Sequence, residues 1–253
     1  MLATGTLKAP TAQLSRPLDI REKLRAYYSG RTRDDRDRSW EFCYRYFHHA
    51  KPEAIKTNRH HAALQLGFYL ASWGMYRNSF LLQYAYTVHL GAVDCLLESK
   101  FSRLWTEEFG ASDNDADLVP LILEACESVR ATYRSFAEAQ HKTVTDTLLT
   151  KVVLGTMGCL PALDEYFKSG IGGAKLNAAF IHKVRRFCRD NFQVLQDEQA
   201  ALEDRYQMHC PLMKLVDAYF HRAGQEIKAA KPKHANNRKA SLLAGRAPTG
   251  SWP

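Results

Sequence analysis

Lys151 and Asp164 are the two residues of this chain whose types and surroundings point most directly to chemistry. Lys151 lies inside an apolar run that begins at Thr150, and Asp164 follows the residues LPAL at the expected start of a helix. A buried lysine amine becomes a nucleophile when apolar surroundings lower its pKa, and a nearby carboxylate stabilises developing positive charge. The competing interpretation is a snorkelling or surface lysine and an aspartate that only caps its helix. The sequence leaves both open.

The segment from Lys151 to Asp164 resembles the active-site region of helix-hairpin-helix DNA glycosylases. In that family a lysine that opens a helix attacks the sugar carbon, and an aspartate after a Val-Pro-type turn stabilises the positive charge. The resemblance implies Lys151 as nucleophile and Asp164 as charge stabiliser. Residues 213–224 (MKLVDAYFHRAG) are similar to the closing helix of some distant members. The chain departs from the family at residues 146–149 (DTLL), where Leu-Pro-Gly-x-Gly is expected, and its lysine-to-aspartate interval is short.

Four other stretches resemble an uncharacterised family of bacterial all-helical proteins. They are residues 70–77 (LASWGMYR), 79–83 (SFLLQ), 154–162 (LGTMGCLPA) and 211–215 (PLMKL). This resemblance carries no activity. It implies a bacterial, cytoplasmic source, and it implies that residues 37–228 form one unit.

Basic residues at two places suggest contacts with phosphate. Arg77 separates two long uncharged runs, and its planar guanidinium suits bidentate contact with a carboxylate or a phosphate. Residues 175–189 are the most basic part of the expected folded body. We interpret five residues as contacts to DNA or RNA phosphates: Arg77, Lys175, Lys183, Arg186 and Arg189. The alternatives are a structural ion pair for Arg77 and an ordinary solvated face for the basic segment.

The net charge is concentrated near the end of the chain. The 253 residues are 45% hydrophobic and 25% charged, as in ordinary globular proteins, and carry a formal charge of +8. Five cations lie between residues 230 and 253, where no acidic residue occurs, which leaves +3 for the rest. The basic character is therefore mostly a property of the tail.

Cysteine and histidine usage predicts neither disulfides nor a metal. Six cysteines are scattered singly and no signal-peptide pattern precedes them, which favours a reduced cytoplasmic protein with buried thiols. The histidine pairs 48–49 and 60–61 are adjacent, so neither pair shares one helix face. No phosphate-binding loop, dinucleotide motif or serine elbow occurs, and we expect no cofactor. The uncharged runs at residues 60–76 and 78–93 are too short to span a bilayer.

The apolar spacing predicts an all-α fold. Apolar residues recur at helical intervals between glycine and proline breaks, and strand-type alternation is absent. We expect one domain of about ten helices over residues 19–228, a loose leader at 1–18, and a basic, disordered tail at 229–253. Residues 57–99 should form a buried central hairpin that breaks near Trp73, with Phe68, Trp73, Phe80 and Leu81 buried.

These patterns favour a bacterial cytoplasmic protein that binds nucleic acid, with a distant or degenerate glycosylase-like fold; whether it is an enzyme stays open. The alternative is a non-enzymatic helical scaffold whose partners contact aromatic residues of 40–47 or the last helix. For catalysis, Lys151 and Asp164 should converge on one solvent-reachable pocket with Arg77 or residues 175–189 on its rim. A purely capping Asp164 would bond only to backbone N–H groups of its own helix.

Overall fold

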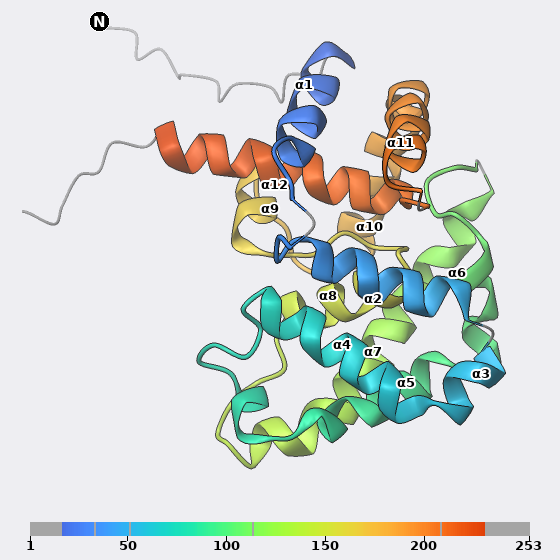
Figure 1. The fold of residues 1–253 in the computed structure, drawn as a ribbon, viewed down its shortest axis with the longest axis vertical. Coiled ribbons are helices and arrows are strands. Elements are labelled where there is room, and N and C mark those ends of the chain that lie inside the picture. Colours follow the sequence, from blue (N-terminus) through green and yellow to red (C-terminus); the bar gives the residue numbers. More distant parts are fainter. Residues whose placement is uncertain (1–16, 33, 51, 113, 208, 231–253) are drawn as a thin grey trace, which may run out of the picture.

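Helices make up the architecture of the protein in the computed structural model, which describes residues 17–230 except residues 33, 51, 113 and 208 (Figure 1). Within these residues no strand occurs, so the all-α prediction is confirmed. The predicted leader and tail lie outside the described residues, apart from their innermost residues in the first and last helices. The α-helices are α1 (Pro17–Tyr28), α2 (Arg38–His49), α3 (Pro52–Thr57), α4 (Arg59–Ser72), α5 (Leu90–Leu96), α6 (Ser102–Thr106), α7 (Leu118–Glu138), α8 (Asp146–Thr156), α9 (Glu165–Gly170), α10 (Ala178–Asp190), α11 (Phe192–Tyr206) and α12 (Leu212–Ala230).

Short polar side chains fix the starts of three helices around the candidate site. The Thr145 hydroxyl accepts a hydrogen bond from the Leu148 N–H at 3.2 Å and begins α8. Asp164 does the same for α9. Asn177 accepts from the N–H three residues on and begins α10. The Asp164 cap is the helix start that the sequence analysis expected at this residue.

The core centres on α8 and α12. Residues 148–163 and residues 210–221 are buried without interruption. Helix α8 packs against α2, α4 and α7, while α12 packs against α1, α9, α10 and α11. Figure 1 shows α12 crossing the molecule with α1 on one side and α9 on the other. Polar residues inside these two stretches are therefore enclosed by packed helices.

Two glycines allow α9 and α12 to approach closely. A Cβ atom on Gly170 would lie 2.0 Å from the backbone oxygen of Phe220, and one on Gly224 would lie 1.8 Å from that of Tyr166. Real Cβ atoms do not come this near to a backbone oxygen, so only glycine fits at either position. The close crossing brings the start of α9 against the middle of α12.

The central segment differs from the predicted simple hairpin. Helix α4 forms as expected, but the following run contains two 3₁₀ turns, Phe80–Gln83 and Tyr86–His89, before the short α5. Phe80 and Leu81 are buried, Trp73 is half-buried, and Phe68 is 66% exposed. The apolar residues of α4 surround the helix, so their spacing does not decide which of them faces the core. The most buried helix is α8.

The cysteines are mostly buried, and the lengths of the helices bear on whether any of them could cross a membrane. All six cysteines are free, five are buried, and Cys95 is partly exposed. In the described part of the chain, no helix combines the length and apolar character that a membrane crossing requires.

Two further 3₁₀ turns, Ser99–Phe101 and Asp115–Asp117, lead into α6 and α7.

Candidate active site

Lys151 is enclosed in the core rather than directed into solvent. It lies in the middle of α8, and only 5% of its side chain is exposed. Its Nζ lies 3.6 Å from Oδ2 of Asp164 and 4.7 Å from the centroid of the Trp73 ring. The structure therefore places the side chains of Lys151, in α8, and Asp164, the N-cap of α9, next to each other.

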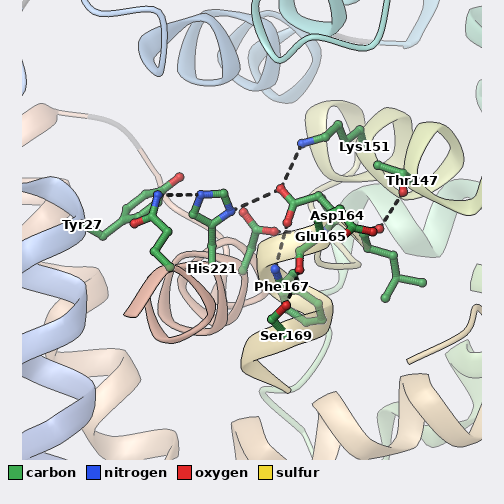
Figure 2. Close-up of polar contacts among 12 residues, drawn as sticks. Tyr27, Thr147, Lys151, Asp164, Glu165, Phe167, Ser169 and His221 are labelled. Carbon is green, nitrogen blue, oxygen red and sulfur yellow. Dashed lines mark hydrogen bonds and ion pairs between the residues drawn. The ribbon is translucent and has the colours of Figure 1, made fainter. Parts of the chain in front are cut away.

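The Asp164 carboxylate uses its two oxygens for different partners. Oδ1 accepts a hydrogen bond from the Phe167 N–H at 2.9 Å, which is the cap of α9. Oδ2 lies 3.2 Å from Nδ1 of His221 and also faces Lys151 (Figure 2). Asp164 does not bond only to its own helix. One oxygen therefore caps α9, and the other faces Lys151 and His221.

The loop at residues 157–163 carries Asp164 back to α8. The Thr150 hydroxyl accepts from the Leu163 N–H at 2.8 Å, and the Thr147 hydroxyl donates to the Leu163 carbonyl at 2.7 Å. Oδ1 of Asp217 in α12 accepts from the Ala162 N–H at 3.0 Å. The first two bonds hold the loop against α8 and the third ties it to α12, so an interval of few residues is enough to bring Lys151 and Asp164 together.

His221 extends the cluster along α12. Its Nε2 lies 3.2 Å from the side-chain nitrogen of Gln225. A carboxylate oxygen only accepts, so the Nδ1–H of His221 donates to Oδ2 of Asp164. The rings of Tyr27, Trp73 and Tyr166 pack around the imidazole. His221 thus links a buried carboxylate to the partly exposed Gln225.

A second buried ion pair lies beside the first. Lys214 Nζ is 2.8 Å from Oδ2 of Asp217 and 3.2 Å from the hydroxyl of Tyr27. The same ammonium lies 5.1 Å from the ring centroid of Trp40 and 5.3 Å from that of Trp73. Cations are stabilised over the faces of such rings. Both buried ammonium groups therefore contact Trp73.

The two buried lysines differ in their electrostatics. Burial lowers the pKa of Lys151, and the charges of Asp164 and Asp217 offset this only in part. Burial also opposes the charge of Lys214, but the neighbouring Asp217 carboxylate raises the pKa of Lys214 above its ordinary value. Lys151 is therefore the amine that loses its proton more readily, as a nucleophilic lysine must.

Asp164 stays ionised although it is mostly enclosed. Burial alone would raise the pKa of the Asp164 carboxyl, but the hydrogen bond from His221 and the charge of Lys151 hold it well below its usual range. A carboxylate kept ionised next to an amine suits the stabilisation of positive charge.

The expected open pocket is not found at this pair. The ring of Trp73 lies against the Lys151 ammonium, and five cavities of the described structure have neither Lys151 nor Asp164 in their walls. The side chains of Asp164 and of His221 beside it are 17% and 10% exposed. Access to the amine therefore requires neighbouring side chains to move.

Arg77 lies on the turn that also carries Trp73. It follows α4, its side chain is exposed, and its N–H donates to the Gly74 carbonyl at 3.1 Å. It borders a cavity with the segment that leads into α8. In the described part of the chain no ion pair involves Arg77, so the structural ion pair considered from the sequence is not present there.

The basic segment lies apart from the buried cluster. Lys175 precedes α10, and Lys183 donates to the Ile171 carbonyl at 2.7 Å. Arg186 and Arg189 border an open cavity whose walls include neither Lys151 nor Asp164. All four cations are exposed. They form a separate surface, so the expectation that they share a rim with Lys151 gains no support from this cavity.

Sequence reasoning missed the contribution of α12. Lys214, Asp217 and His221 are charged or titratable residues at helical spacing within a stretch that is otherwise apolar. Such spacing places side chains on one face of a helix, and that was the available signal. The cage formed by Tyr27, Trp40 and Trp73 had no comparable signal, because its members come from three separate segments.

No family model, no curated protein and no solved structure matches this chain. The class of protein is therefore defined by fold and site: an all-α protein whose core encloses a lysine–aspartate–histidine cluster and a second lysine–aspartate pair. Among the residues that the structure describes, no group of three histidine, cysteine or acidic side chains is placed to hold a metal ion.

Proposed function

We propose that this chain is a bacterial, cytoplasmic nucleic-acid-binding protein that removes a base from a sugar by lysine chemistry. The observation that carries the proposal is the convergence of Lys151 and Asp164, which are 3.6 Å apart in the core. The lowered pKa of Lys151 supports it, since only the neutral amine is a nucleophile. The resemblance of residues 151–164 to glycosylase active sites suggests the reaction class.

The reaction would proceed in four steps: displacement of the base, proton transfer, opening of the sugar ring and hydrolysis. The lone pair of the neutral Lys151 amine attacks C1′ of the sugar, and the C1′–N bond breaks with its electron pair leaving on the base. The base takes up one proton, and the Lys151 nitrogen loses one. The C1′–O4′ bond then opens: O4′ leaves with the electron pair and takes one proton from solvent, and a protonated Schiff base remains between Nζ and C1′. Water hydrolyses this Schiff base to the sugar aldehyde, returns the neutral amine and releases one proton to solvent.

The neighbouring residues would act through charge and orientation. Asp164 stabilises the positive charge that develops on the sugar, and its cap fixes the carboxylate at the start of α9. His221 holds Oδ2 of Asp164 by its Nδ1–H. Lys214, protonated and caged by aromatic rings, adds a positive charge that favours the neutral form of Lys151.

Trp73 would have to move for a sugar to reach the amine. Its ring lies 4.7 Å from Lys151 Nζ, and its buried indole N–H has no hydrogen-bond partner in the described structure. An unsatisfied buried donor weakens the hold on the ring. In the borohydride experiment described next, Trp73→Ala should therefore form the covalent adduct with DNA at least as fast as the parent protein.

Borohydride trapping tests the chemistry. Incubation with lesion-containing or abasic duplex and borohydride should yield a covalent adduct, mapped by mass spectrometry to Lys151. Lys151→Gln should abolish the adduct while leaving the circular dichroism spectrum intact. Lys100→Gln, which removes a surface lysine paired with Glu98 and Glu124, is the matched control. An adduct that persists in Lys151→Gln, or no adduct with any substrate, would exclude the mechanism.

Binding is tested separately by a mobility-shift titration in low salt. Phosphate contacts release counterions, so affinity should fall steeply as salt is added. The full-length protein is compared with a full-length variant in which the five tail cations are replaced by glutamine. If this variant no longer binds, the interaction belongs to the tail and not to the fold.

Exposed apolar residues favour a second function, that of a helical scaffold. Leu64 and Phe68 lie one turn apart on α4 and are 47% and 66% exposed, and Phe42 on the neighbouring α2 is 49% exposed. Light scattering that shows a stable oligomer, lost in Phe68→Asp, together with no nucleic-acid binding, would support this function over the first.

A further inference from the structure

A cavity of about 230 Å³ lies between the turn after α4 and the segment before α8. One wall is formed by residues 74–80 and carries Arg77, Asn78 and Ser79. The opposite wall carries Lys142, Thr143 and Thr145, and Leu148 closes the space. Every polar side chain on these walls can donate a hydrogen bond.

The charge of this cavity distinguishes it from others in the described structure. Its walls include two cations and no carboxylate. Four other cavities each include an acidic residue, namely Glu107 and Glu108, Asp190 (in two of them) or Glu198. A wall with arginine, lysine, hydroxyl and amide donors and no competing carboxylate suits an oxyanion.

The two cations are available for a ligand. Arg77 and Lys142 are exposed, and neither forms an ion pair within the described residues. Many other cations are engaged: Arg103, for example, pairs with Glu107 and Asp117, and Arg130 pairs with Asp146. A guanidinium and an ammonium that border the same cavity, with no carboxylate in its lining, can both contact one anion.

The walls are set by local backbone geometry. Asn78 and His141 both adopt left-handed conformations, with φ of 56° and 52°, next to Arg77 and Lys142 respectively. The Lys142 N–H bonds back to the Ala137 carbonyl at 2.9 Å. These turns set the direction of the backbone beside both cations.

Both walls lead directly to the lysine cluster. The first continues to Trp73, whose ring contacts Lys151 and Lys214. The second continues through the Thr145 cap into α8, which carries Lys151. An anion in the cavity would therefore lie close to Trp73, which covers Lys151, and close to the N-terminus of α8, which carries Lys151.

We propose that this cavity binds a phosphate group of the nucleic acid, adjacent to the nucleotide whose sugar Lys151 attacks. The inference rests on the proposed function for the identity of the phosphate donor. Arg77 would contact two phosphate oxygens as a fork, and Lys142 would contribute a point charge from the other wall. The hydroxyls of Thr143 and Ser79 would donate to the remaining oxygens.

Titration with inorganic phosphate tests the site. Backbone amide NMR shifts of residues 77–79 and 142–145 are followed in the full-length protein, at constant ionic strength set with chloride. Saturable shifts are expected there, and Arg77→Gln and Lys142→Gln should each weaken binding by about tenfold. Arg25→Gln, which removes an exposed arginine beside a different cavity, should leave it unchanged. Absence of saturable shifts, or equal weakening by Arg25→Gln, would overturn the site.

A second arm identifies the source of the phosphate. A duplex oligonucleotide with one abasic nucleotide is titrated into the same variants. If Arg77→Gln and Lys142→Gln bind the duplex more weakly than the parent protein does, the result supports the nucleic-acid assignment. If both variants bind inorganic phosphate weakly but bind the duplex as the parent protein does, the site binds a free phosphate compound and the nucleic-acid assignment fails. Phosphate binding without any borohydride adduct would refute the proposed chemistry and leave this site standing.

Discussion

At the scale of single residues, Asp164 combines a structural and an electrostatic task. One oxygen caps α9 and the other faces Lys151 and His221. Asparagine retains a capping oxygen but not the charge, whereas alanine loses both. Asp164→Ala should therefore lower the unfolding free energy by about 1 kcal/mol more than Asp164→Asn. Urea denaturation of both variants measures the difference, and equal losses would show that the cap contributes nothing.

Lys151 should give the protein a characteristic pH dependence. Its pKa is lowered from 10.5 in the folded state, chiefly by burial. Between the folded pKa and 10.5 the unfolded chain binds more protons at this residue, so stability rises with pH in that window. Lys151→Met should remove this rise, because methionine does not titrate.

Urea denaturation at a series of alkaline pH values compares Lys151→Met with the parent protein. Subtracting the two curves cancels the opposite contribution of Lys214, whose raised pKa makes stability fall above 10.5. A difference curve that stays flat across the alkaline range would contradict the lowered pKa.

At the scale of elements, the crossing of α9 and α12 positions the cluster. A Cβ atom on Gly224 would lie 1.8 Å from the backbone oxygen of Tyr166. In an open helix, replacing glycine by alanine stabilises by about 1 kcal/mol. Gly224→Ala should instead destabilise, by roughly 1–3 kcal/mol or more, because the helices must separate.

The sign of this change is decisive and is read from thermal or urea unfolding. Gly170→Ala should behave in the same way, since its Cβ would meet the Phe220 backbone oxygen. Gly172→Ala is a useful comparison, because nothing lies within 4 Å of its Cβ position and any cost there comes from its positive φ of 80°. A stabilised Gly224→Ala variant would mean that the crossing is looser than described.

At the scale of the whole molecule, a buried histidine links α5, α7 and the turn after α4. His89 is fully buried, with Nε2 2.7 Å from the Tyr76 hydroxyl and Nδ1 2.7 Å from the Tyr133 hydroxyl. Burial lowers its pKa from 6.5 to about 4. As pH falls from 6.5 towards 4, the unfolded chain binds the proton first, so about 3 kcal/mol of stability is lost.

His89→Gln should flatten this acid dependence, because glutamine keeps hydrogen-bonding groups but does not titrate. Unfolding free energies between pH 7 and pH 4 test it. Asp164 contributes its own loss only as pH falls below its ordinary value of 3.8, since its folded pKa is depressed. An unchanged slope in His89→Gln would assign the acid sensitivity to other groups.

The sequence determined the helices and several of their ends. Apolar spacing and short-range caps such as Thr145 and Asp164 act over three or four residues, so they can be recognised in the sequence. It also placed a lysine where burial would lower its pKa. The secondary structure of residues 78–93 was harder to predict, because a uniformly apolar run does not distinguish an α-helix from successive 3₁₀ turns.

Which groups meet depends on the packing of helices that are distant along the chain. Lys151, Asp164 and His221 come from three helices, and the aromatic wall beside them comes from segments as far apart as Tyr27 and Trp73. The cavity of Arg77 and Lys142 joins two turns in the same manner. Such convergence depends on how whole helices pack and on where glycine allows them to touch, and no local pattern of residues encodes those distances.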